Sequence, residues 1–137
     1  MKQIDELIRG EMAAVESFDS VLAKINDEDE KQKLSSIRMD HVRAVDTLKR
    51  FVRTDLRDDI KQSGPWGAFS KAFAGGASFL GNKAAIQALK VGEEHGIREY
   101  RVALEDQSIE PELKQVIRSE LLPQQERHIS MIEDYLH

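Results

Sequence analysis

Four polar side chains in this sequence stand where helical spacing predicts apolar ones. Two are glutamates and two are histidines: Glu11, His41, Glu93 and His128. Glutamate is among the residues least often buried, and an unpaired buried carboxylate either costs several kcal/mol or takes up a proton. The four side chains must therefore compensate one another or bind a positive ion.

Carboxylate oxygens and imidazole nitrogens are ligands for zinc, iron and manganese. The chain has no cysteine, which excludes thiolate metal sites, iron–sulfur clusters and disulfides within it. We predict one transition-metal ion held by all four side chains in the centre of a helical bundle. A metal-free alternative is two buried hydrogen-bonded pairs, Glu11 with His41 and Glu93 with His128, that only fix the packing register.

Four segments must position these side chains, and each has apolar residues at intervals of three and four, which predicts an α-helix. The segments are 3–25, 27 to about 62, 82–106 and 108–136. Asp27 with Glu30 forms a capping-box pattern, and Pro111 suits the first turn of a helix. Pro123 lies inside the fourth segment and predicts a kink. No alternating strand pattern of useful length is present, so the predicted fold class is all-α.

The segment 63–81 differs from the rest of the chain because it is rich in glycine and aromatic residues and has one charged residue, Lys71. A chain of 137 residues suits one hydrophobic core. We therefore predict a single domain, 1–137, in which a partly helical crossover, 63–81, joins two helical hairpins, 3–62 and 82–136. The aromatic crossover either completes the core or forms a patch for a membrane surface or a protein partner.

The two hairpins resemble each other in sequence. Residues 7–11 and 89–93 share the pattern L-x-x-G-E, and each Glu is followed seven residues later by an aromatic residue, Phe18 or Tyr100. Two hairpins built alike pack readily as an antiparallel four-helix bundle with pseudo-twofold symmetry. This predicts that the four polar side chains come from four different helices.

Counting residues from the helical turns predicts which side chains lie at one level. Glu11 and His41 are each about fifteen residues from the first turn, or roughly 23 Å at 1.5 Å per residue, so they can meet. Glu93 is also about fifteen residues from the second turn, whereas His128 is about twenty. The partner of Glu93 is therefore either His128 or the more nearly level Gln124.

Longer motifs resemble those of a bacterial ferritin-like four-helix-bundle family of unknown function, a distant relative of rubrerythrins and bacterioferritins. They are the two L-x-x-G-E hairpins, G-P-W-G-A-F in the crossover, G-E-E-H-G-I-x-E-Y at 92–100 and L-L-P-Q-Q-E-R-H at 121–128. The resemblance covers nearly the whole chain. It implies a ferritin-like bundle in which Glu11 and Glu93 match single glutamates, and His41 and His128 match the histidines of Glu-x-x-His motifs that hold two irons.

The sequence departs from that pattern at two positions where a di-iron site has carboxylates. Arg38 and Gln125 stand three residues before His41 and His128. Two glutamates would leave about two positive charges of two divalent ions uncompensated, so one ion is favoured. Asp40, Glu94 and Glu126 are predicted to lie on the surface or behind the ligands, and Tyr100 either donates to a ligand or is a core residue. His95 is predicted to lie on the surface.

Charge and hydropathy exclude other functional classes. The net charge is −5 and the pI about 5.4, with scattered basic residues, which gives little basis for nucleic-acid binding. No membrane span or secretory signal is evident, so we expect a cytoplasmic protein. The predicted function is metal binding, and a stress-related role and assembly as a homo-oligomer are further expectations. Alternatives are a di-metal oxidase or peroxidase, and a metal-free interaction module that uses the crossover 63–81.

Overall fold

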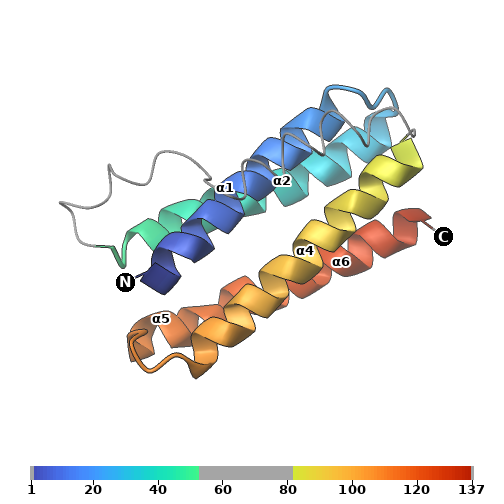
Figure 1. Ribbon diagram of the computed structural model, residues 1–137. Helices are drawn as coiled ribbons and strands as arrows, with labels where there is room; N and C mark the ends of the chain where they lie inside the picture. Colours follow the sequence, from blue (N-terminus) through green and yellow to red (C-terminus); the bar gives the residue numbers. More distant parts are fainter. Residues whose placement is uncertain (1, 53–81, 137) are drawn as a thin grey trace.

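The computed structural model describes residues 2–52 and 82–136, and every element in these ranges is helical (Figure 1). The elements are α1 (Lys2–Leu22), α2 (Glu28–Lys49), α4 (Asn82–Glu105), α5 (Pro111–Val116), the π-helical turn η3 (Ile117–Leu121) and α6 (Leu122–Leu136). The all-α prediction is confirmed for this part of the chain. The predicted crossover, 63–81, lies outside the described residues.

The helices lie side by side in two pairs, α1 with α2 and α4 with α6, and the pairs meet mainly where α1 packs against α4. In Figure 1, α1 runs from left to right and α4 from right to left, so these two helices run in opposite directions. A short turn after Leu22 joins α1 to α2, as the sequence predicts. This arrangement gives each of the four long elements one face towards a common interior.

The ends of the second helix follow from local hydrogen bonds. The Asp27 carboxylate accepts a 3.0 Å hydrogen bond from the Glu30 amide, which caps α2 as predicted. The prediction that this helix continues to about residue 62 is wrong, because α2 ends at Lys49. Beyond it the amides of Phe51 and Val52 each bond to the carbonyl three residues back, and Val52 is buried in the core. The remaining residues, 53–62, are not among those described.

The last helical segment is irregular near Pro123, where the π-helical turn η3 precedes α6. Glu110 is the N-cap and Pro111 the first residue of α5, as predicted. In η3 the Leu122 amide donates to the Ile117 carbonyl five residues back, so one extra residue fits into the turn just before Pro123. The extra residue rotates everything after it by about 100° relative to a regular helix. It therefore decides which side chains of α6 face the interior.

The core consists of two apolar clusters separated by a polar layer. One cluster includes Leu7, Leu48 and Leu113, and the other includes Phe18, Ile37 and Leu89. The polar layer consists of Glu11, His41, Glu93 and His128, each of which falls between residues of the two clusters along its own helix. Burial of both clusters stabilises the fold, at roughly 25 cal/mol per Å² of apolar surface removed from water. It also holds the polar layer between the two clusters, near the middle of the helices.

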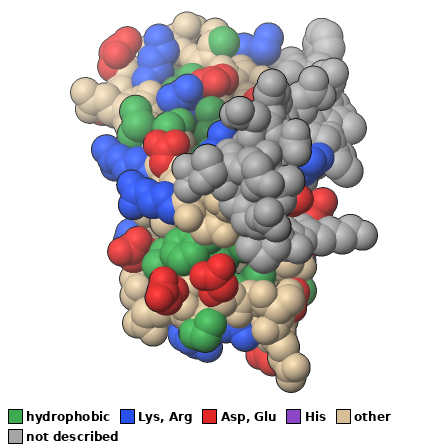
Figure 2. Space-filling model, turned by 90° about the vertical axis from the view of Figure 1, so that its left-hand side faces the viewer, with side chains coloured by type: hydrophobic (Ala, Val, Ile, Leu, Met, Phe, Trp, Pro, Cys, Tyr) green, Lys and Arg blue, Asp and Glu red, His purple; other side chains and the backbone are tan. Residues whose placement is uncertain are grey.

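No described helix has an apolar stretch long enough to cross a membrane. On the face shown in Figure 2, acidic and basic side chains are interspersed around small patches of hydrophobic ones.

Candidate metal centre

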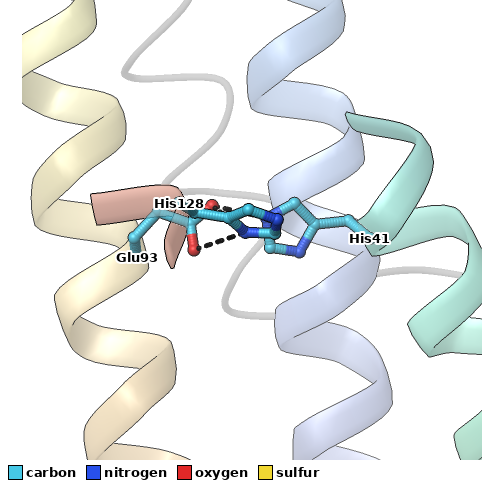
Figure 3. Close-up of side chains that lie close together, drawn as sticks. All are labelled: His41, Glu93 and His128. Atoms are coloured by element: carbon cyan, nitrogen blue, oxygen red, sulfur yellow. Dashed lines mark hydrogen bonds and ion pairs between the residues drawn. The ribbon is translucent and has the colours of Figure 1, made fainter. Parts of the chain in front are cut away.

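All four predicted side chains are buried, with exposed fractions of 5% for Glu11, 1% for His41 and 2% each for Glu93 and His128. Three of them form a compact group. His41 from α2, Glu93 from α4 and His128 from α6 each offer one ligand-type atom, and these atoms lie within 4.8 Å of one another (Figure 3). The sequence therefore located the buried polar residues, and the structure brings three of them to a single point.

His41 lies between two carboxylates. Its Nε2 is 2.5 Å from Glu93 Oε1, and its Nδ1 is 2.6 Å from Glu11 Oε2. Because the two nitrogens are on opposite sides of the ring, Glu11 and Glu93 cannot bind the same side of His41. Glu11 is thus a neighbour of the three-residue group, in contact with His41 and outside the group itself.

His128 is the partner of Glu93, and Gln124 is not. His128 Nδ1 lies 3.4 Å from both oxygens of the Glu93 carboxylate, and its Nε2 lies 2.9 Å from Asp40 Oδ2. Gln124 instead donates to the backbone carbonyl of Asp40 at 3.3 Å. Asp40 is half-buried and stands behind His128, one of the two places predicted for it.

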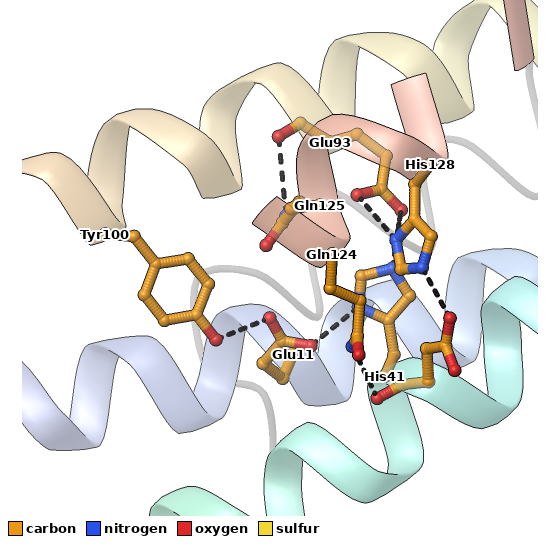
Figure 4. Close-up of polar contacts among 8 residues, drawn as sticks. Glu11, His41, Glu93, Tyr100, Gln124, Gln125 and His128 are labelled. Atoms are coloured by element: carbon orange, nitrogen blue, oxygen red, sulfur yellow. Dashed lines mark hydrogen bonds and ion pairs between the residues drawn. The ribbon is translucent and has the colours of Figure 1, made fainter. Parts of the chain in front are cut away.

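Two more side chains donate to the glutamates, one to the Glu11 carboxylate and one to the Glu93 backbone (Figure 4). The Tyr100 hydroxyl donates to Glu11 Oε1 at 2.8 Å, and the Gln125 amide donates to the Glu93 carbonyl at 3.4 Å. Tyr100 therefore has the donor role that the sequence left open. The ring of Phe18 covers His41, with centroids 5.6 Å apart.

The pKa values record this mutual compensation. Burial acts to lower the pKa of His41, but the carboxylates of Glu93 and Glu11 raise it well above 6.5. Burial acts to raise the pKa of Glu93, but His41 and His128 outweigh it and bring that pKa to about 2. Burial together with Glu11 raises the pKa of Tyr100 well above 10. Without a metal, His41 is thus an imidazolium held between two anions.

Three other charged residues near the ligand positions, Arg38, Glu94 and Glu126, lie outside the cluster. Arg38 contacts Asp19 at 2.5 Å on the outside of the bundle, so its charge does not oppose a bound cation. Glu94 and Glu126 are exposed, as predicted. Gln125 is buried beside Glu93, so the inward position that a di-iron site would fill with a carboxylate holds a neutral amide.

The metal-free alternative also predicted real contacts, since Glu11 lies against His41 and Glu93 against His128. The contact that it missed is between His41 and Glu93, which joins the two pairs into one network. Helical spacing alone gave no signal for it, because it depends on how closely α2 and α4 approach across the bundle.

Gly96 leaves the space that Gln125 occupies. A Cβ at Gly96 would fall inside contact distance of the Gln125 amide nitrogen and 3.0 Å from its Cδ. We expect Gly96→Ala to destabilise the fold by about 1 kcal/mol, because the displaced amide loses its hydrogen bond. In a Gln125→Ala background the same change should stabilise by up to about 1 kcal/mol through helix propensity. Urea denaturation of the four proteins measures both effects, and equal effects in the two backgrounds would contradict the assignment.

Comparison of the chain with protein-family models, curated proteins and solved structures found no match. The resemblance to ferritin-like proteins therefore stays a prediction.

Proposed function

We propose that this protein binds one divalent transition-metal ion through His41 Nε2, His128 Nδ1 and the Glu93 carboxylate. The observation that carries the proposal is that each histidine turns one nitrogen to Glu93 and the other to a separate carboxylate. Glu11 holds His41 Nδ1 at 2.6 Å, and Asp40 holds His128 Nε2 at 2.9 Å. Metal-bound histidines typically donate their remote N–H to a carboxylate or carbonyl in this way.

The remote carboxylates select the tautomers that metal binding needs. A proton on His41 Nδ1, donated to Glu11, leaves Nε2 available as a ligand. A proton on His128 Nε2, donated to Asp40, leaves Nδ1 available in the same way. We therefore assign Glu11, grouped with the ligands on sequence grounds, to orienting His41.

The spacing suits an ion that replaces a shared proton. Ligand atoms around a tetrahedral ion with bonds of roughly 2.1 Å are about 3.4 Å apart. His128 Nδ1 and Glu93 are already separated by 3.4 Å, whereas His41 Nε2 and Glu93 are 2.5 Å apart, at hydrogen-bond distance. Binding thus requires loss of the proton between His41 and Glu93. It also requires His41 Nε2 and the Glu93 carboxylate to move about 1 Å further apart.

Charge favours one ion over two. Among the described residues, the buried carboxylates are Glu11 and Glu93, which together balance one divalent ion. Two histidines with one carboxylate form a ligand set used by zinc and by non-haem iron(II), with positions left for water. We assign the protein a binding role, and the paired hairpins and polar layer support a ferritin-like antiparallel bundle as its fold.

Titration of the metal-free protein with Co(II) tests the proposal. Co(II) substitutes for zinc or iron, and its visible absorption bands report the coordination number. We expect binding of one ion per chain, with four or five ligands. Saturation at 100 times the Kd should stabilise the fold by about 2.7 kcal/mol, measurable as a rise in Tm.

Paired histidine variants separate the site from adventitious binding. His128→Ala should abolish the absorption bands, whereas His95→Ala, which removes a half-exposed histidine outside the cluster, should leave them unchanged. Two ions per chain would support the di-metal oxidase or peroxidase instead. No binding by the wild-type protein would leave the network as a purely structural element and end the proposal.

A further inference from the structure

A groove between α1 and α4 reaches the carboxylates of the polar layer. Small residues form much of its walls, and its cavity of about 30 Å³ has room for a water-sized guest. They include Gly10, Ala13 and Ala14 on α1 and Ala88, Gly92 and Gly96 on α4. Glu11 and Glu93 also line this cavity. The metal ligands His41 and His128 do not, so the groove reaches the cluster from its carboxylate side.

The charged side chains that line the groove are all acidic among the residues that the structure describes. Four glutamates line it, and no lysine, arginine or histidine of the ranges 2–52 and 82–136 does. Because α1 and α4 run in opposite directions (Figure 1), Glu6, five residues before Glu11 on α1, and Glu99, six residues after Glu93 on α4, lie towards the same end of the groove. Glu6 and Glu99 are partly exposed, whereas Glu11 and Glu93 are buried. Negative charge therefore extends from solvent to the cluster, which attracts cations and repels anions.

The opposite flank of the cluster, between α2 and α6, has a different electrostatic character. There the half-buried Asp40 carboxylate lies 2.9 Å from His128 Nε2, and the guanidinium of Arg43 lies 3.5 Å from Asp40. Gln124 also covers this flank by bonding to the Asp40 carbonyl. A cation approaching from this side would meet an arginine before any metal ligand.

We infer that a divalent metal ion enters through the groove between α1 and α4, with Glu6 and Glu99 as the carboxylates that first attract it. This inference rests on the proposed metal site, because it describes the route to that site. The two outer carboxylates attract the hydrated ion, and Glu11 and Glu93 compensate its charge as it loses water. The cavity, about 30 Å³, has room for a single small ion and is too small for a larger ligand.

Stopped-flow mixing of the metal-free protein with Co(II) tests this route through the rate of appearance of the absorption bands. The double variant Glu6→Gln/Glu99→Gln should slow uptake at least threefold at low ionic strength, and the difference should shrink in about 0.5 M salt. The final stoichiometry should remain one ion per chain. The matched control, Glu94→Gln/Glu126→Gln, removes the same charge from exposed positions outside the groove and should change the rate less than twofold.

A variant on the opposite flank separates the two routes. Arg43→Gln should leave the rate unchanged if the ion enters between α1 and α4, and faster uptake would indicate entry between α2 and α6 and overturn the inference. Equal slowing by both double variants would also overturn it, since the effect would then come from net charge. If the wild-type protein takes up no Co(II), the proposed metal site is rejected. If Co(II) binds normally and Glu6→Gln/Glu99→Gln does not alter the rate of uptake, only the proposed entry route is rejected.

Discussion

Replacement of Glu93 by alanine is expected to destabilise the metal-free protein by about 3 to 5 kcal/mol, because it breaks a buried ion pair from one side. Glu93 lies 2.5 Å from His41 Nε2 and 3.4 Å from His128 Nδ1, with an exposed fraction of 2%. Without it, the His41 imidazolium retains Glu11 as its one counter-charge among the residues that the structure describes. His128 loses the carboxylate that faces its Nδ1.

The same variant should lose Co(II) binding, since the remaining two imidazoles bring no negative charge to the ion. Urea denaturation in the presence of a chelator measures the stability loss, and the Co(II) absorption bands measure the binding. Glu94→Ala is the matched control, because it removes the adjacent, exposed carboxylate of the same helix. A loss of stability below about 1 kcal/mol would show that Glu93 is not paired as the structure indicates.

A concerted replacement should cost less than the single ones. In His41→Leu/Glu93→Leu, both charges are removed together and apolar side chains fill the space, so the loss should be smaller than the sum of the two single losses. The difference measures the coupling between the two side chains. Additive losses would mean that His41 and Glu93 are held independently.

The sequence was a good guide where the argument depended on one helix or one short turn. Burial of Glu11 and Glu93 followed from their places in the apolar stripes, and the level of Glu11 with His41 followed from counting residues back from a tight turn. Asp27 and Pro111 marked helix starts because capping acts over three or four residues. Each of these inferences uses local geometry that varies little between proteins.

Features that depend on distances between helices could not be predicted in the same way. The count from the second turn left His128 and Gln124 as alternatives, because the π-helical turn at Ile117–Leu121 was not visible in the sequence. This turn adds a residue with little advance along the axis, which accounts for part of the mismatch. Contact of His128 with Asp40 was likewise hidden, since it depends on the packing of α6 beside α2.

The pH dependence of stability should reveal the charge state of the polar layer. The pKa of His41 is raised above its unfolded value of 6.5, so its contribution is complete below pH 6.5 and declines as the pH rises towards the folded pKa. The pKa of Glu93 is lowered from 4.5 to about 2, so its contribution is complete above pH 4.5 and declines as the pH falls towards 2. The metal-free protein should therefore be most stable between about pH 4.5 and 6.5.

Each flank of this maximum should have the slope of one proton, roughly 1.4 kcal/mol per pH unit at its steepest. Urea denaturation from pH 3 to 9 in chelator measures it. His41→Gln should flatten the alkaline flank, while His95→Gln, at a half-exposed position outside the cluster, should preserve it. Stability that rises between pH 6.5 and 8 would show that His41 is not held as a cation.

Bound metal should reverse the change of stability with pH on the alkaline side of the maximum. An ion can bind His41 Nε2 only after the proton shared with Glu93 leaves, so affinity increases with pH as that proton becomes easier to remove. In excess Co(II), stability should therefore rise between pH 6 and 8, the range in which the metal-free protein becomes less stable. A structural hydrogen-bond network that binds no metal has no means of producing opposite slopes, so parallel curves with and without Co(II) would reject the metal site while leaving the charged pair intact.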